Sequence, residues 1–236
     1  MQSLEGKTAI ITGATSGVGL AISLKLIGEG VKTYLIGRSF KKLEKTYPNF
    51  ENNNKINFVK IDFEIENDVN KLIEVIGSQS IDILIHSAGI ISYQLFENET
   101  LENFDKQYHI NVKIPFLLTQ KFLPNIIKAK GIVVFINSTA GLDPKEYLSQ
   151  YSASKHALKA LSKSLHKELL KDGVKISNLY LGATNTPMQE EIQKKKGNVY
   201  KKEKLINTDD IAEFLILILK KSNSLTIPDI TFLPNI

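Results

Sequence analysis

The sequence contains no cysteine, which excludes disulfide bonds and any catalysis or metal binding by thiolates. Arginine is almost absent, since Arg38 is the only arginine among 30 basic residues. No apolar run approaches the roughly 18 residues that a membrane-spanning helix needs. The first residues, MQSLEGKTAIITG, lack a charged segment with a cleavable apolar core and lead directly into an expected strand. These absences predict a cytoplasmic protein that does not enter a membrane.

Length and composition indicate one large packed domain. The chain has 236 residues, of which 42% are hydrophobic and 23% charged. The formal net charge of +5 could indicate a polyanionic partner, but lysines are dense only over residues 194–204. We therefore expect no nucleic-acid partner.

Short apolar runs alternate with longer segments of helical period. The runs are rich in β-branched residues and apolar on both faces, as in buried parallel strands. The expected strands cover 8–12, 33–37, 56–61, 81–86, 132–137, 174–180 and 229–233, and the expected helices cover 17–29, 40–47, 65–77, 101–129, 151–171 and 208–221. This alternation predicts an α/β fold with a doubly wound parallel sheet of about seven strands and helices on both faces. No linker or repeat divides the chain.

A glycine-rich turn joins the first expected strand to the first expected helix, in the sequence TGATSGVG. Gly13, Gly17 and Gly19 permit a tight turn and let a pyrophosphate approach the backbone closely. The helix that follows would offer free N–H groups and its positive dipole end to the phosphates. A glycine cluster alone also fits a loop that binds nothing, but this position favours a phosphate cradle.

The spacing T-G-x-x-x-G-x-G from Thr12 to Gly19 resembles the cofactor loop of the short-chain dehydrogenases/reductases, and the resemblance continues from Gly6 to Pro234. It implies a single NAD(P)-binding Rossmann domain over residues 1–236 with no metal. Departures from the family pattern are His86-Ser87-Ala88-Gly89 in place of N-N-A-G, and Leu181 in place of a proline. The cofactor-binding residues that the resemblance implies are Gly13, Thr15, Ser16, Gly17, Val18, Gly19, Arg38, Ser39, Asp62, Phe63, Ser87, Ala88, Gly89, Asn111, Tyr151, Lys155, Gly182, Thr184 and Thr186.

The sole arginine follows the second expected strand, in Ile36-Gly37-Arg38-Ser39. NAD-preferring relatives carry an aspartate at the position of Gly37, where an acid binds the ribose hydroxyls. Gly37 would leave room for a 2′-phosphate, and Arg38 could stack on the adenine and hold that phosphate with two hydrogen bonds. We therefore predict that NADP(H) is preferred over NAD(H) and that Gly37→Asp shifts the preference toward NADH. The alternative is that Arg38 is an ordinary surface residue.

The motif YSASK places Tyr151 and Lys155 on one face of an expected helix. A phenol titrates near pH 10, so we expect the lysine ammonium and a positively charged nicotinamide to lower its pKa toward neutrality. By resemblance, Ser138 orients a substrate carbonyl. Asn111 would complete a catalytic tetrad.

Pro115 lacks the N–H group that would bond to the Asn111 carbonyl in a regular helix. That carbonyl could hold a water that connects Lys155 to solvent, or the proline could simply kink the helix. Asp62 resembles the residue that contacts the adenine amino group, and a cap at the strand end is its alternative role.

Residues 187–205 correspond to the substrate-covering loop of the family. Its lysines over 194–204 fit either a solvated, mobile lid or the attraction of an acidic substrate. By analogy, Met188, Leu142, Tyr147 and Tyr93 are expected as pocket walls. His86 is expected to hydrogen-bond a neighbouring loop, with proton transfer as the less favoured role.

The resemblance thus implies an NADPH-dependent oxidoreductase that reduces a ketone, aldehyde or 3-oxoacyl compound, with Tyr151 as acid and base. The alternative is a non-catalytic NADP(H)-binding sensor or scaffold on the same fold. Nucleotide-sugar epimerases share the Tyr–Lys pair, but the glycine spacing and length fit them poorly. The expected partners are a small-molecule substrate and further copies of the chain, in a homodimer or homotetramer that pairs helices 101–129 and 151–171.

Overall fold

The computed structural model describes residues 2–46, 53–221 and 224–235. Seven strands form one sheet in the order β3-β2-β1-β4-β5-β6-β7, and all neighbouring pairs are parallel. The strands are β1 (Thr8–Thr12), β2 (Lys32–Gly37), β3 (Ile56–Lys60), β4 (Ile83–His86), β5 (Ile132–Ser138), β6 (Lys175–Leu181) and β7 (Asp229–Phe232). The predicted doubly wound fold is confirmed. The order reverses between β1 and β4, which is where open α/β sheets bind ligands.

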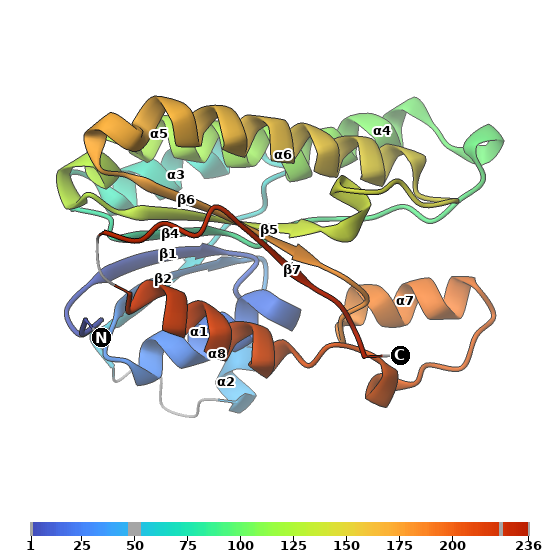
Figure 1. Ribbon diagram of the computed structural model, residues 1–236, viewed down its shortest axis with the longest axis horizontal. Helices are drawn as coiled ribbons and strands as arrows, with labels where there is room; N and C mark the ends of the chain where they lie inside the picture. The colour runs from blue at the N-terminus through green and yellow to red at the C-terminus, as the bar shows by residue number, and fades with distance from the viewer. Residues whose placement is uncertain (1, 47–52, 222–223, 236) are drawn as a thin grey trace.

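Helices cover both faces of this sheet (Figure 1). They are α1 (Gly17–Gly28), α2 (Lys41–Thr46), α3 (Glu66–Ile76), α4 (Leu101–Tyr108), α5 (Ile114–Ala129), α6 (Ser149–Leu169), α7 (Pro187–Lys195) and α8 (Thr208–Leu219). One face carries α3, α4, α5 and α6, and the other carries α1, α2 and α8. No helix in the described ranges has both the length and the apolarity to span a membrane.

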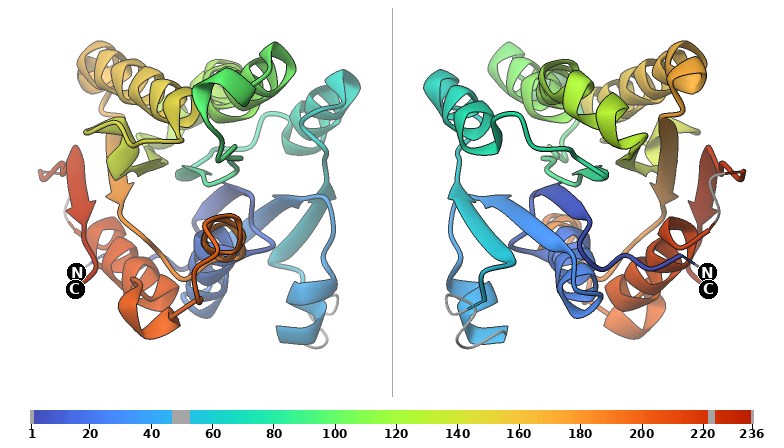
Figure 2. Two further views of the ribbon diagram at one scale, coloured as in Figure 1. Left: turned by 90° about the vertical axis from the view of Figure 1, so that its right-hand side faces the viewer. Right: turned by 90° about the vertical axis from the view of Figure 1, so that its left-hand side faces the viewer.

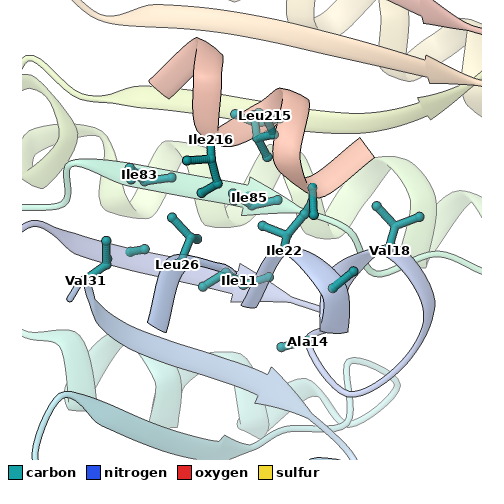
Figure 3. Close-up of a cluster of buried hydrophobic side chains, with 14 of the residues drawn as sticks. Ile11, Ala14, Val18, Ile22, Leu26, Val31, Ile83, Ile85, Leu215 and Ile216 are labelled. Carbon is teal, nitrogen blue, oxygen red and sulfur yellow. The ribbon is translucent and has the colours of Figure 1, made fainter. Parts of the chain in front are cut away.

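The strands are apolar on both faces because each face meets a helical layer. Ile11 of β1 belongs to a buried cluster with Leu26 of α1 and Leu215 of α8 (Figure 3). The neighbouring Ile10 faces the other way and belongs to a second cluster with Leu118 of α5. Burying both faces fixes the strand positions, so the carboxyl ends of the strands form a rigid edge.

The helix expected over 101–129 is interrupted. A π-helical turn, His109–Lys113, separates α4 from α5, and in it the Ile114 N–H donates to the His109 carbonyl. Pro115 lies just beyond this turn and has no N–H to continue the regular α-helical pattern. The wider π-helical turn accommodates the missing N–H of Pro115 without ending the helical segment.

The segment 187–205 is not wholly a loop, because α7 occupies its first half. Thr186 caps this helix by accepting the Gln189 N–H at 3.2 Å, and Pro187 takes the first helical position. The other expected elements agree with the structure to within two residues at each end. The expected helix 40–47 ends at a residue that lies outside the described ranges.

Candidate active site

A cavity of about 480 Å³ lies at the carboxyl ends of the strands. Its walls include residues that end or follow each strand from β1 to β6, such as Gly13, Arg38 and Ser138. Most of the predicted site residues line it, namely Gly13, Thr15, Ser16, Gly17, Val18, Arg38, Asp62, Phe63, Ser87, Ala88, Gly89, Ser138, Tyr151, Lys155, Gly182, Thr184 and Thr186. Gly19, Ser39 and Asn111 do not line the cavity.

The glycine turn packs its backbone directly on neighbouring backbone. Gly13 has a φ of +65°, and a Cβ there would lie 2.8 Å from the Ala88 Cα. A Cβ on Gly19 would lie 2.3 Å from the Gly13 carbonyl oxygen, so the backbone of Gly19 packs directly on that of Gly13. The turn therefore presents bare backbone at the start of α1, and this cradle fits the pyrophosphate of a dinucleotide.

Thr12 holds the opposite side of this cradle, a role that the sequence analysis missed. Its hydroxyl oxygen accepts the N–H groups of Ser87 and Ala88, each at 3.1 Å, and donates to the Ile85 carbonyl at 3.4 Å. The threonine of the T-G pair was a signal for this contact. The loop after β4 is thereby fixed against the end of β1.

The far end of the cavity is built from residues after β2 and β3. Arg38 is exposed at its rim, whereas Ser39 is exposed outside it. The Asp62 carboxylate accepts the Glu64 N–H at 3.1 Å, so the expected capping role at the strand end is present. His109 Nε2 donates to the Phe63 carbonyl at 2.7 Å and ties this loop to the π-helical turn.

The side chains of Tyr151 and Lys155 come from the first turns of α6 and are both buried. The Lys155 ammonium donates to the Ile136 carbonyl at 3.0 Å and lies 5.7 Å from the centre of the Tyr151 ring. Ser138 stands at the end of β5, where its hydroxyl oxygen accepts the Ala140 N–H at 3.1 Å. A Cβ on Gly141 would lie 2.8 Å from the Lys155 carbonyl oxygen, so this glycine lets the loop pack on α6.

Burial controls the protonation of this pair. It raises the pKa of Tyr151 to about 12, against an opposing hydrogen bond with Ser138. It lowers the pKa of Lys155 to about 8. The Lys155 ammonium is bonded to the Ile136 carbonyl, and the lowering of the Tyr151 pKa expected from this lysine together with a bound nicotinamide stays a prediction. At neutral pH the phenol is protonated, and Lys155 is mostly charged.

Asn111 is buried behind the cavity, with its amide fully engaged. Its Oδ1 accepts the Ile90 N–H at 2.9 Å, and its Nδ2 donates to the Ile90 carbonyl and the Ser154 hydroxyl, both at 3.0 Å. The side chain thus connects the segment after β4 to α6. The role of its backbone carbonyl in a water relay stays a prediction.

His86 is buried and stacks on Phe135 with 5.0 Å between ring centres. Its Nε2 lies 2.9 Å from the Thr119 hydroxyl, which belongs to α5 and not to a loop as expected. Burial lowers the pKa of His86 to about 3. The imidazole is therefore neutral at pH 7, which argues against a role in proton transfer.

Helix α7 contributes residues to one wall of the cavity. It lies toward the viewer in the left view of Figure 2. Met188 lines the cavity as predicted, and so do Gln189 and Ile192, which the sequence analysis missed. The T-P-x-Q pattern after residue 185 was the available signal for this helix.

The other three expected wall residues, Leu142, Tyr147 and Tyr93, do not line the cavity. The rings of Tyr93 and Tyr147 pack against each other with 5.2 Å between their centres and an angle of 31° between their planes. Lys196, just beyond α7, places its ammonium 5.2 Å from the centre of the Tyr93 ring. The tyrosine pair therefore contacts the residue that follows α7 and does not line the cavity.

Comparison with known proteins places these features in a family. Residues 7–197 match the family described as short chain dehydrogenase. An NADPH-dependent 3-dehydrocapnine reductase of Ornithobacterium rhinotracheale is 32% identical over 82% of this chain and 70% of its own length. An uncharacterized oxidoreductase of Staphylococcus haemolyticus is 30% identical over 99% of this chain and 100% of its own length. A metagenomic short-chain oxidoreductase, solved in complex with NADP, superposes with a TM-score of 0.82 at 25% identity and full coverage of both chains.

Proposed function

The chain belongs to the short-chain dehydrogenase family, and we propose that it is an NADPH-dependent reductase of a ketone, aldehyde or 3-oxoacyl compound. The observation that carries this proposal is the placement of one protonated phenol, one charged lysine and one hydroxyl on the same cavity as the glycine cradle. Carbonyl reduction needs a proton donor and a hydrogen-bond donor at the carbonyl oxygen, and Tyr151 and Ser138 can fill these two roles.

Bound NADPH would supply a hydride to the carbonyl carbon of the substrate. Tyr151 donates the matching proton to the carbonyl oxygen, so one proton is consumed for each alcohol formed. Ser138 hydrogen-bonds that oxygen and holds it near the phenol. The positive charge of Lys155, held by the Ile136 carbonyl, stabilises the phenolate left after proton transfer. Asn111 positions the wall behind these groups through Ile90.

Preference for NADP(H) over NAD(H) is part of the proposal. Arg38 stands at the rim of the cavity, and position 37 carries no acid. One relative is named as NADPH-dependent, and one neighbouring structure is a complex with NADP. These observations support the proposed preference for NADP(H).

We also propose that residues 187–205 cover the substrate and that the protein is a cytoplasmic homodimer or homotetramer. Met188, Gln189 and Ile192 support the first statement, because they bring α7 to the cavity wall. The oligomeric state rests on the family resemblance alone, and the molar mass of the purified protein in solution tests it.

The test is a panel of ketones, aldehydes and 3-oxoacyl thioesters, screened with NADPH and with NADH by loss of reduced-cofactor absorbance. We expect turnover of at least one substrate class and a higher kcat/KM with NADPH. Tight NADPH binding with no turnover of any member would contradict the reductase and favour a sensor or scaffold.

A further inference from the structure

We infer that Thr15 determines cofactor specificity together with Gly37, because its side chain lies too close to the place where the Cβ of an acidic residue at position 37 would be. The inference rests on the proposed NADP(H) preference and concerns how the chain enforces it. It changes the expectation that Gly37 simply leaves open space for a phosphate.

The two residues meet because β1 and β2 are neighbouring parallel strands. The register pairs Thr12 with Ile36, so the turn after β1 lies beside the end of β2. A Cβ on Gly37 would lie 2.6 Å from the Thr15 Cγ2, 3.0 Å from its Oγ1 and 3.4 Å from its Cβ. Real Cβ contacts below 3.0 Å are essentially never observed, so residue 37 can carry a side chain only if Thr15 moves.

Backbone conformation does not explain the glycine. Gly37 lies in β2 and is absent from the residues with positive φ among those that the structure describes. A glycine in a strand often marks a close approach of another group. Here that group is the Thr15 side chain, and both residues line the cavity.

The contact with Thr15 changes what the substitution Gly37→Asp is expected to do. In Gly37→Asp alone, the new Cβ displaces Thr15 and strains the turn that leads into Ser16 and Gly17. Because that turn forms the phosphate cradle, the single variant weakens both cofactors. With Thr15→Ala, the nearest remaining atom is the residue 15 Cβ at 3.4 Å, an ordinary van der Waals contact. The carboxylate then has room to bind ribose hydroxyls.

The first experiment measures the clash without any cofactor or substrate. Gly37→Ala is combined with Thr15→Val, which keeps both offending positions filled, with Thr15→Ser, which removes Cγ2, and with Thr15→Ala, which removes both. Gly37→Ala alone should lower the melting temperature by about 2–8 °C. Each double variant is compared with the variant that carries only its substitution at residue 15. The loss of melting temperature caused by Gly37→Ala should persist with valine, become smaller with serine and vanish with alanine. An equal loss in all three backgrounds overturns the contact.

The second experiment measures dissociation constants for NADP⁺ and NAD⁺ by calorimetry. Gly37→Asp should bind NADP⁺ at least about tenfold more weakly with no gain for NAD⁺. Gly37→Asp/Thr15→Ala should bind NAD⁺ at least about tenfold more tightly than the single variant does. Two results would overturn the role of Thr15 in specificity. One is that Gly37→Asp alone switches the preference fully to NAD⁺. The other is that Thr15→Ala relieves the clash in the melting experiment but does not tighten NAD⁺ binding in Gly37→Asp/Thr15→Ala. If the reductase proposal fails, both experiments still give an answer, since neither needs turnover.

Discussion

The two ends of the cavity are built on different principles. At the end formed by the glycine turn and β2, neighbouring atoms leave no room for a Cβ at Gly13, Gly19 and Gly37. At the other end, Tyr151 and Lys155 are buried ionisable groups with strongly shifted pKa values. Function at the first end therefore depends on volume and little on pH, whereas function at the second depends on protonation.

Because of this difference, we expect substitutions at one end to change cofactor binding and substitutions at the other end to change turnover. An added methyl group at the cradle alters packing that the cofactor must share, so it changes binding. An atom removed from Tyr151 leaves the packing of the ring intact and changes only the proton that it can donate. Binding and turnover should thus fail independently.

The largest effect is expected for Tyr151→Phe, which deletes the acid and keeps the ring. Turnover should fall by about 10³-fold, within the range for loss of a general acid, while the dissociation constant for NADPH changes by less than about threefold. Steady-state kinetics and fluorescence titration measure the two quantities. Tyr108→Phe on α4 is the matched control and should behave as wild type. Equal losses of NADPH binding and turnover in Tyr151→Phe would contradict the separation of these two functions between the two ends of the cavity.

At the cradle, Gly19→Ala should have the reverse profile. Its Cβ would meet the Gly13 carbonyl at 2.3 Å, so we expect about 1–3 kcal/mol of destabilisation and NADPH binding weakened by up to about 100-fold. Gly28→Ala, at the exposed end of the same helix, meets no atom within 4 Å and should be neutral or slightly stabilising. Thermal melting and NADPH titration at two pH values test this, and wild-type behaviour of Gly19→Ala would refute the packing argument.

A smaller effect is expected from the buried charge of Lys155. Its pKa is lowered by burial from 10.5 to about 8, so the unfolded chain binds more protons between these values. The cost of burying the charge is fully present below pH 8 and is relieved as the pH rises. The free energy of unfolding of wild type should therefore gain on the order of 2 kcal/mol over Lys155→Met between pH 8 and pH 9.5. Urea unfolding at the two pH values measures the gain, and a constant difference would show that Lys155 is not perturbed.

Arg38→Ala should have the smallest effect, and it should be confined to one cofactor. We expect kcat/KM with NADPH to fall about tenfold and that with NADH to change by less than about twofold, since only NADPH carries the 2′-phosphate. Arg38→Lys should recover part of the loss, because lysine keeps the charge but not the bidentate geometry. An unchanged NADPH/NADH ratio would make Arg38 an ordinary surface residue.

Much of the fold was predictable because parallel strands buried on both faces leave an uninterrupted apolar signal, as in TAIIT and IVVFIN. The Tyr151–Lys155 pair and the glycine turn were predictable for a related reason, since each is a local pattern. Helix α7 was missed because its surroundings are rich in lysine, which hid the cap formed by Thr186.

Features that depend on three-dimensional neighbours could not be predicted from the sequence. The contact between Thr15 and Gly37 joins a turn to a different strand. The raised pKa of Tyr151 depends on how deeply α6 buries the phenol, which the motif does not encode. In the same way, Pro115 indicated a disturbed helix, but its resolution as a π-helical turn depends on the packing around His109.

Transfer of a deuterium label tests the proposed reaction most directly. NADPH that carries deuterium at both C4 positions is incubated with the best carbonyl substrate of the panel, and the product is analysed by mass spectrometry and NMR. The proposed reaction predicts one alcohol for each NADPH consumed, with one deuterium on the former carbonyl carbon. An alcohol without deuterium at that carbon, or oxidation of NADPH without an alcohol, would contradict it.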